Sequence, residues 1–361
     1  MRLLLLAALL APDDFDLRRL RPFWTSTTMD GKSVLFMKEG DLARAPLLFV
    51  PTRVIAVRGT IAFEEGKDWA WTPGTRELTL PAGSRIPCST PGELRRPAGS
   101  QRHRLTHRDG GGEILFGPGH EYHDLQVEVT YEHAPDAWKG PVPGFAGERL
   151  PRSTSRLAGK TPLTISLLGD SISTGCNASG WAKAPPFQPA WQDLLAKKLE
   201  AASGAKVELK NHAVGGTTSD WGLKNIAKVV EDAPDLVILA FGMNDAGGVA
   251  PAAYRANLQG MIDAVRKGRP EAEFILVATM LGNPDWTYLK HERFPEFRAA
   301  LASLRGPGVE LADLTSFWAE FHRHKRDLDL TGNGVNHPND FGHRVYAQVL
   351  SSLLLSPDAL K

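Results

Sequence analysis

The chain has 361 residues, of which 42% are hydrophobic and 23% charged, a composition that excludes a disordered or fibrous protein. Its 42 Lys and Arg residues balance 41 Asp and Glu residues, so the net charge of +1 gives no electrostatic reason to expect a nucleic-acid partner. The two cysteines, Cys88 and Cys176, are too few for a disulfide framework, although they could pair with each other in an oxidising compartment.

The first residues have the pattern of a targeting segment. Met1-Arg2 is followed by residues 3–11, which are only Leu and Ala. A short basic end followed by an apolar run is typical of a secretory signal peptide, so residues 1–11 predict export to the periplasm or the medium. The alternative is a frayed N-terminal helix. Beyond the first dozen residues no segment is long and apolar enough to cross a membrane, and we expect no integral membrane segment.

Residues 12–133 predict a β domain. Their short apolar runs are separated by Gly and Pro, and the run from Leu125 to Tyr131 alternates apolar and polar residues. This alternation indicates a strand with one buried face. Several short strands separated by turns predict a β-sandwich. Residues 134–161 are rich in Pro, Gly, Ser and Arg, so we expect a linker there.

Residues 162–361 predict a second domain of a different class. Leu163–Leu168 is a continuous apolar run, as expected for a strand that is buried on both faces. Further strands are expected at 207–210, 236–241, 273–279 and 309–311, and helices at 189–202, 221–230, 252–267, 294–304 and 340–355. Alternating strands and helices indicate a parallel sheet that is covered by helices on both faces. In such sheets the functional residues follow the carboxyl ends of the strands.

Four residues at these strand ends and before the last helix suggest acyl-transfer chemistry. Ser171 follows the first strand, Gly216 the second and Asn244 the third, and His337 precedes the last helix. A serine becomes a good nucleophile only when a base takes its proton, and a histidine titrates in the range that suits this task. The N–H groups of Ser171 and Gly216 and the side-chain amide of Asn244 could together bind an oxyanion. Each residue alone is more often a turn residue, but their order along the sheet favours catalysis.

The residues around these four positions resemble the sequence blocks of the SGNH (GDSL-type) hydrolases. The resemblance covers residues 162–355 and rests on Gly169-Asp170-Ser171, Gly216, Gly242-Met243-Asn244-Asp245 and His337-Pro338-Asn339. It implies a flavodoxin-like three-layer α/β/α fold and ester hydrolysis through an acyl-enzyme. By the same resemblance Ser171 is the nucleophile and His337 the base, and Ser171, Gly216 and Asn244 form the oxyanion hole. Neither a cofactor nor a metal ion is implied.

One position departs from the family pattern. The family usually has an aspartate three residues before the histidine, and this chain has Gly334 there. Three groups could orient His337 instead: the side chain of Asn333, a backbone carbonyl, or a distant carboxylate such as Asp327 or Asp329. We favour a neutral acceptor, and Asn333 is the candidate residue. A neutral acceptor would fix the imidazole tautomer but stabilise the imidazolium less than a carboxylate does.

A β domain ahead of an esterase domain resembles the layout of two-domain bacterial carbohydrate esterases, which implies acetyl esters of a polysaccharide as substrate. Trp181, Trp221 and Trp286 lie in loops that should border the active site. Indole faces suit sugar rings, but each Trp could equally pack the loop or the core.

The leading interpretation is a secreted serine esterase that removes O-acyl groups, acetyl groups in particular, from a small-molecule or polysaccharide substrate. A carbohydrate O-acyltransferase would use the same residues as far as the acyl-enzyme, so the motifs do not separate the two. A carbohydrate-binding protein without activity is the third interpretation, and the missing aspartate motivates it.

Overall fold

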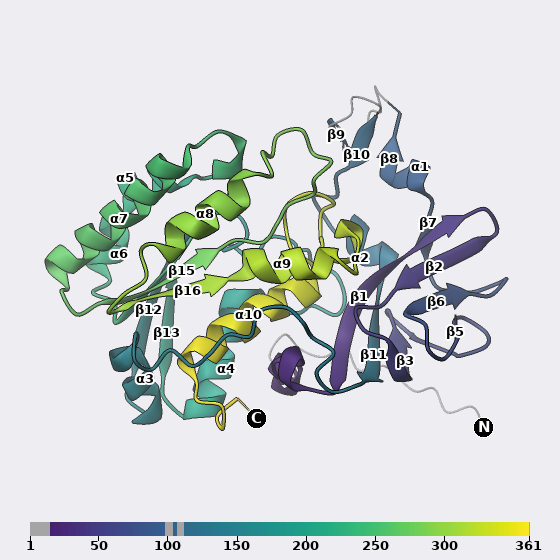
Figure 1. Ribbon diagram of the computed structural model, residues 1–361, viewed down its shortest axis with the longest axis horizontal. Helices are drawn as coiled ribbons and strands as arrows, with labels where there is room; N and C mark the ends of the chain where they lie inside the picture. Colours follow the sequence, from purple (N-terminus) through teal and green to yellow (C-terminus); the bar gives the residue numbers. More distant parts are fainter. Residues whose placement is uncertain (1–14, 98–103, 107–111, 361) are drawn as a thin grey trace.

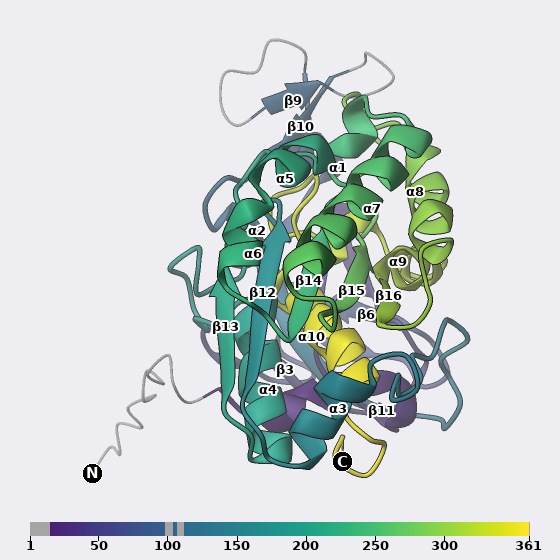
Figure 2. The ribbon, with the colours of Figure 1, turned by 90° about the vertical axis from the view of Figure 1, so that its left-hand side faces the viewer.

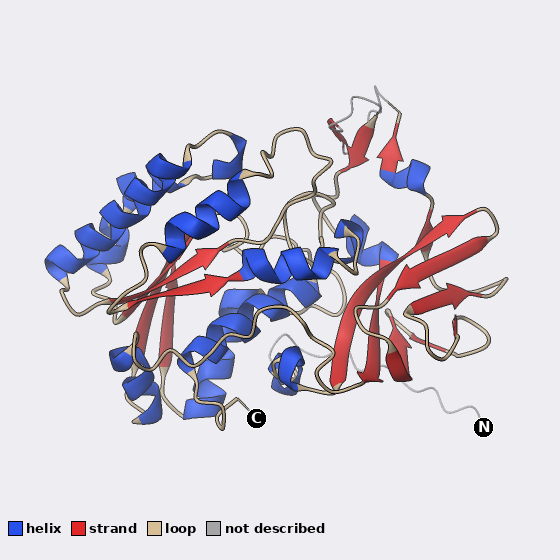
Figure 3. Cartoon of the chain, viewed as in Figure 1, coloured by secondary structure: helices blue, strands red, loops and turns tan. Residues whose placement is uncertain are grey.

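A computed structural model describes residues 15–97, 104–106 and 112–360, shown in Figure 1. The predicted signal peptide, residues 1–11, lies outside the described residues. The N-terminal half of the chain forms mostly strands, and the C-terminal half combines strands with longer helices, as the colouring of Figure 3 shows.

The N-terminal half contains an antiparallel sheet built around the long strand β1 (Thr28–Glu39). The strand order is β4-β3-β11-β1-β2-β6-β5, and the short β7 pairs with β1 in parallel. The bounds are β2 (Leu42–Pro46), β3 (Pro51–Arg58), β4 (Ala62–Phe63), β5 (Ala70–Trp71), β6 (Glu77–Leu80), β7 (Cys88–Ser89) and β11 (Gln126–His133). A smaller sheet has the order β8-β10-β9, with β8 (Arg95–Arg96), β9 (Arg104–Thr106) and β10 (Glu113–Leu115). The antiparallel sheet is as expected, whereas a sandwich of two facing sheets stays a prediction.

Strand β11 shows why the alternating pattern could be recognised in the sequence. Val127, Val129 and Tyr131 are buried, and the residues between them are half-buried. Because side chains alternate between the faces of a strand, one face packs into the core while the other lies nearer the solvent. Leu125 is not part of this strand but ends the short helix α2 (Glu121–Leu125). The remaining short helices are α1 (Pro91–Leu94), η1 (Leu17–Leu20), η2 (Phe23–Thr25), η3 (Asp245–Gly247) and η4 (Asp327–Asp329).

The predicted linker contains a helix, α3 (Pro151–Ala158), which begins at a proline, a residue favoured in the first helical turn. The backbone N–H groups of Arg152 and Ser153 each donate to the carboxylate of Glu273, at 2.8 Å. These bonds satisfy N–H groups that have no partner within the helix. The second half of the predicted linker is therefore fastened to the C-terminal domain, and the limits of the two domains stay a prediction.

The C-terminal half is a five-stranded parallel sheet with the order β13-β12-β14-β15-β16. The strands are β12 (Leu163–Gly169), β13 (Val207–Asn211), β14 (Leu236–Ala240), β15 (Glu273–Ala278) and β16 (Val309–Asp313). In sequence order this is 2-1-3-4-5, which is the flavodoxin-like arrangement. Figures 1 and 2 show helices α5 (Ser219–Asn225), α6 (Ala227–Glu231), α7 (Pro251–Gly268) and α8 (Arg293–Ala302) on one face, and α4 (Trp191–Ser203) and α10 (Asp340–Leu354) on the other. The predicted α/β fold is confirmed; helix α9 (Leu314–His322), after the last strand, was not predicted.

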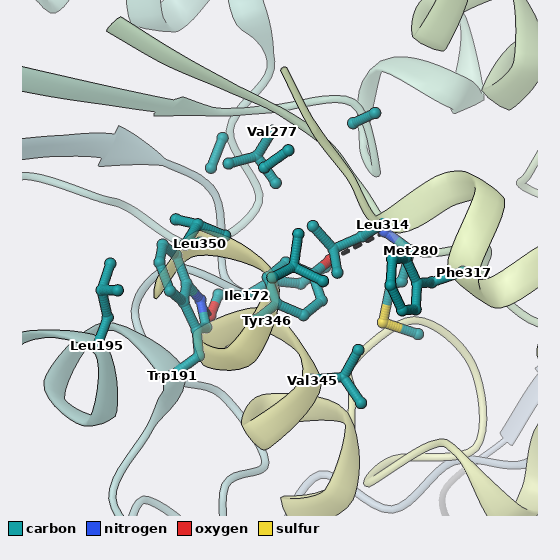
Figure 4. Close-up of a cluster of buried hydrophobic side chains, with 14 of the residues drawn as sticks. Ile172, Trp191, Leu195, Val277, Met280, Leu314, Phe317, Val345, Tyr346 and Leu350 are labelled. Carbon is teal, nitrogen blue, oxygen red and sulfur yellow. Dashed lines mark hydrogen bonds between the residues drawn. The ribbon is translucent and has the colours of Figure 1, made fainter. Parts of the chain in front are cut away.

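Figure 4 shows a cluster of buried hydrophobic side chains that includes Ile172 in the turn after β12. Trp191 of α4 is fully buried, and its Nε1–H donates to the carbonyl oxygen of Ile172 at 3.0 Å. The hydroxyl oxygen of Tyr346 on α10 accepts from the N–H of Met280 at 2.9 Å, just after β15. Buried polar atoms are costly unless they are paired, so these bonds fix loops at the sheet edge to the core.

Both cysteines are free. Cys88 is exposed on β7, and Cys176 is half-buried in the loop after β12. The pairing that the sequence allowed is therefore not made in this structure. Among the residues that the structure describes, no helix has the length and apolar character needed to span a membrane.

Candidate active site

Ser171 and His337 meet at the carboxyl edge of the parallel sheet. Ser171 lies in the turn that follows β12, and His337 lies in the loop just before α10. The Oγ atom of Ser171 is 2.8 Å from Nε2 of His337. This distance lies within hydrogen-bond reach, as general-base activation of a serine requires.

The loops that follow β12, β13 and β14 are bonded to one another beside Ser171. The N–H of Val214 donates to Gly169 O at 3.0 Å, and Nδ2 of Asn244 donates to Thr217 O at 2.9 Å. Gly216 lies between these contacts with a φ of +77°, a conformation that favours glycine. The structure thus gathers Ser171, Gly216 and Asn244 at one edge, as the sequence led us to expect.

The other nitrogen of the imidazole contacts a residue that the sequence analysis missed. Nδ1 of His337 is 2.7 Å from Oδ1 of Asn177. Asn177 lies in the loop after β12, six residues beyond Ser171, and the residue is 1% exposed. The sequence analysis sought a partner near His337 in the chain. No motif marks Asn177, and the available signal was only a polar residue in the loop that carries the nucleophile.

The prediction that Asn333 orients the imidazole is wrong. Oδ1 of Asn333 accepts from the backbone N–H groups of Val335 at 3.0 Å, Asn336 at 3.0 Å and His337 at 3.2 Å. Its oxygen is therefore used to shape the loop, and its contact with His337 is to the backbone and not to the ring. Asn333 is fully buried, so its amide is a structural part of this loop.

The distant carboxylates are bound elsewhere. Oδ1 of Asp329 accepts from the N–H of Leu35 at 2.9 Å, and Oδ2 lies 3.4 Å from Nζ of Lys325. The carboxylate of Asp327 lies 4.0 Å from Nε2 of His322. The group at Nδ1 of His337 is thus a neutral side chain, as favoured above, but from a different residue.

The absence of the family aspartate at Gly334 has a steric reason. Gly334 has a φ of +89°, and a Cβ at this position would collide with the carbonyl oxygen of Leu115 and the hydroxyl of Tyr122. Both residues belong to the N-terminal half of the chain, and Tyr122 is fully buried. The N-terminal domain therefore occupies the space that an aspartate side chain at position 334 would need.

Burial shifts the titration of two groups in the site. It lowers the pKa of His337 to about 4, so the imidazole is neutral and able to accept a proton at neutral pH. Burial raises the pKa of Asp170 to about 7, and the nearby carboxylate of Asp245 adds to this shift. Oδ1 of Asp170 accepts from the N–H of Ile172 at 3.0 Å, which holds the turn beside Ser171.

The three predicted substrate-binding tryptophans differ in their surroundings. The Trp286 ring stacks on Tyr288, with ring centroids 5.0 Å apart, and the Tyr288 hydroxyl donates to the backbone oxygen of Asn244 at 3.2 Å. This links Trp286 to a predicted oxyanion residue. Trp181 is 45% exposed, whereas Trp221 and Trp286 are partly buried and both pack against the hydrophobic core. Tyr288 was not singled out in the sequence.

No metal site was found among the described residues, because none of their His, Cys, Asp and Glu side chains form a group of three or more that could hold an ion.

Comparisons with known proteins relate the C-terminal domain to ester hydrolases. Residues 167–345 match the model of the GDSL-like Lipase/Acylhydrolase family. An arylesterase from Vibrio mimicus is 30% identical over 102 residues, which cover 28% of this chain and 47% of that protein, so the chain spans about half the length of this curated relative.

Solved structures give weaker similarity over a larger part of the chain. A two-domain esterase described as active on acetylated mannans is 22% identical, with a TM-score of 0.44 over 60% of this chain and 53% of that one. An acetylxylan esterase from Geobacillus stearothermophilus is 16% identical, with a TM-score of 0.42 over 52% of this chain and 92% of that one.

Proposed function

Because residues 167–345 belong to the GDSL-like lipase/acylhydrolase family, we propose that the protein is a serine ester hydrolase. The observation that carries the proposal is the 2.8 Å contact between Ser171 Oγ and His337 Nε2, with Nδ1 held by Asn177. A pure binding protein would need no such arrangement. The missing aspartate was the reason to consider a non-catalytic protein, and Asn177 removes that reason by supplying an acceptor at Nδ1.

The reaction begins with the attack of Ser171 Oγ on the acyl carbon of the ester, while His337 Nε2 takes the hydroxyl proton. The carbonyl π electrons move to the oxygen, which receives hydrogen bonds from the N–H groups of Ser171 and Gly216 and from Asn244 Nδ2. One N–H of that amide is already bonded to Thr217 O at 2.9 Å, which leaves its second N–H for the oxyanion.

Collapse of this intermediate breaks the ester C–O bond, and the leaving alcohol takes the proton from the imidazolium. Water then attacks the acyl-enzyme with His337 as base again, which releases the acid and restores Ser171. Asn177 Oδ1 stabilises the imidazolium as a dipole and not as a charge. We therefore expect a slower reaction than a carboxylate partner would allow in a site of otherwise equal geometry.

The finer proposal is that the substrate is an O-acetylated carbohydrate and that the protein is secreted or periplasmic. The stacked pair of Trp286 and Tyr288 beside Asn244, and the half-exposed Trp181, support a sugar-binding rim. The pattern of residues 1–11 supports export.

The test compares the wild type with Ser171→Ala and Trp286→Ala on p-nitrophenyl acetate and on an acetylated oligosaccharide. The proposal expects Ser171→Ala to be inactive on both, and Trp286→Ala to lose kcat/KM only on the oligosaccharide. Equal activity of Ser171→Ala and the wild type would contradict the esterase. Transfer of acetyl to an added sugar, in place of release as acetate, would identify an acyltransferase.

A further inference from the structure

We propose that the N-terminal domain sets the tautomer of the catalytic histidine, through backbone carbonyls that orient the side-chain amide of Asn177. This inference rests on the proposed function and adds a positioning role for a domain that lies outside the hydrolase fold. Figure 1 shows helix α2 between the N-terminal sheet and the hydrolase domain. Gly117 and Gly119 just before this helix, and His123 within it, contact the loop that carries Asn177.

Three backbone carbonyls surround the amide nitrogen of Asn177. Nδ2 donates to Gly119 O at 3.2 Å, to Gly117 O at 3.4 Å and to Gly332 O at 3.2 Å. Two of these acceptors belong to the N-terminal half, more than 50 residues before Asn177 in the chain. Since carbonyl oxygens only accept hydrogen bonds, the side of the amide that faces them must be the N–H₂ group.

The orientation of the amide determines where the imidazole proton lies. With Nδ2 directed to the carbonyls, Oδ1 of Asn177 faces Nδ1 of His337 at 2.7 Å. An amide oxygen only accepts, so Nδ1 must carry the proton. Nε2 then keeps its lone pair and can accept the hydroxyl proton of Ser171 across 2.8 Å. The reversed amide would place its oxygen against three carbonyl oxygens and its N–H₂ against Nδ1, which selects the tautomer that cannot act as base.

Further contacts fasten the same segment to both loops of the site. The imidazole of His123 on α2 contacts the backbone oxygen of Asn177 through Nε2 at 3.0 Å. The N–H of Gly117 donates to the backbone oxygen of Asn333 at 2.9 Å, in the loop that carries His337. The segment that excludes a side chain at Gly334 thus also supplies the carbonyls that make Asn177 effective.

This geometry makes an unusual prediction for Asn177→Asp. In a typical triad a carboxylate at Nδ1 is the better partner, because it stabilises the imidazolium. Here the second carboxylate oxygen would face three carbonyl oxygens, and like partial charges at hydrogen-bond distance repel. We expect this repulsion to move the carboxylate of Asn177→Asp away from Nδ1, so that the base loses the acceptor that fixes its tautomer and kcat falls about 10²-fold at pH 8.

The experiment measures kcat, KM and the imidazole ¹⁵N shifts in protein labelled at the histidine rings, with His337→Gln used to assign the signal. The wild type should show the Nδ1–H tautomer of His337. Asn177→Asp and Asn177→Ala should lower kcat while KM stays within about threefold of the wild type, because Asn177 acts on the base and not on the substrate. In both variants the ¹⁵N shifts should show a larger fraction of His337 with its proton on Nε2.

Two variants in the N-terminal half separate this role from general packing. Gly117→Ala places a Cβ 2.9 Å from a ring carbon of the buried Tyr122, so the segment must shift, and we expect about tenfold lower kcat as the tautomer becomes mixed. Gln126→Glu is the matched control. Its amide crosses the same interface to Leu328 O at 2.8 Å and Thr331 O at 2.9 Å without contacting His337. It should weaken the fold while the tautomer and kcat stay within about threefold of the wild type, because Gln126 contacts neither the imidazole ring nor Asn177.

An Asn177→Asp variant as active as the wild type at pH 8 would overturn the proposal, as would a wild type with its proton on Nε2. Gln126→Glu losing as much kcat as Asn177→Asp would also overturn it, because interface weakening would then explain both. Failure of the esterase proposal would look different, with Ser171→Ala retaining the activity of the wild type. The ¹⁵N measurement on the wild type needs neither activity nor a folded variant.

Discussion

Ser171 and His337 face each other across 2.8 Å, yet the two residues are held by different parts of the molecule. The Ser171 turn is supported within the C-terminal domain, by Trp191 of α4 and by Thr174, whose hydroxyl donates to Ser171 O at 2.8 Å. The His337 loop also contacts the N-terminal half through Gly117, and the imidazole contacts Asn177, whose amide donates to Gly119 O of that half. The contacts that hold the Ser171 turn thus come from the C-terminal domain, whereas the orientation of the base also depends on the docking of the two halves.

The largest effect is expected from substitutions that test whether Ser171 and His337 act together in one step. Ser171→Ala, His337→Ala and the double variant should each lower kcat by about 10⁵–10⁶, because the serine and its base work only together. Single-turnover and steady-state kinetics on p-nitrophenyl acetate would measure this. A double variant much slower than either single variant would indicate independent contributions and contradict a shared step.

On the nucleophile side, Asn244→Ala should lower kcat by about 10²–10³ with a small change in KM, since its N–H acts on the developing oxyanion. Asn225→Ala is the matched control, because that amide donates to Trp221 O at 2.9 Å on α5. The control should stay within about twofold of the wild type, because this partly buried amide does not act on the oxyanion. Equal losses in both variants would remove Asn244 from the oxyanion hole.

On the histidine side, introducing the family aspartate at position 334 should destabilise the folded protein. Gly334→Asp combines a φ of +89° with a collision against Leu115 and Tyr122, so we expect a loss of about 3 kcal/mol or more in the free energy of unfolding. Urea unfolding would measure this loss, with Gly66→Asp as the control, because Gly66 has a similar φ of +78° and open space at its Cβ. A Gly334→Asp variant as stable as its control would show that the N-terminal domain leaves room there.

Substitutions of Asn333 should have a smaller effect, and they distinguish a structural role in the His337 loop from a role in proton transfer. Asn333→Ala leaves two buried N–H groups and one partly buried N–H group without their acceptor and should cost about 2–3 kcal/mol of stability and about tenfold in kcat. Asn333→Asp keeps an oxygen for these groups and should stay within about threefold of the wild type, because the loop is preserved. Thermal unfolding and kcat would be compared for both. Strong activation of Asn333→Asp would instead place this residue at the imidazole.

The smallest expected effect is in the pH profile. Burial lowers the pKa of His337 to about 4, and only the neutral imidazole accepts the serine proton. We therefore expect kcat/KM to be full at neutral pH and to fall as pH drops through about 4, and not near 6.5. The unfolded chain binds this proton below about pH 6.5 and the folded chain only near 4, so stability should also decrease as pH falls between these values. A decrease of kcat/KM on the acid side centred near pH 6.5 would contradict the lowered pKa of the buried His337.

Much of the fold and most residues of the candidate site could be predicted from the sequence, because the signals are local. Apolar runs such as Leu163–Leu168 mark buried strands, and strand β11 shows the alternation of a half-buried sheet. Parallel strands end at one edge, so Ser171, Gly216 and Asn244 had to lie near one another once the strands were recognised. Helix α9 was missed because its dense aromatic residues, Phe317, Trp318 and Phe321, do not leave a clear polar face.

The sequence by itself determined the chemistry available at the sheet edge, because side-chain identity and strand order are encoded along the chain. Only the tertiary structure decided which group orients His337. Asn177 is separated from His337 by 160 residues, and its amide is oriented by backbone carbonyls, a group that every residue carries. Backbone oxygens have no residue signature, so their positions depend on how the N-terminal segment docks beside Gly334. That docking arises from packing between distant parts of the chain, which local patterns do not specify.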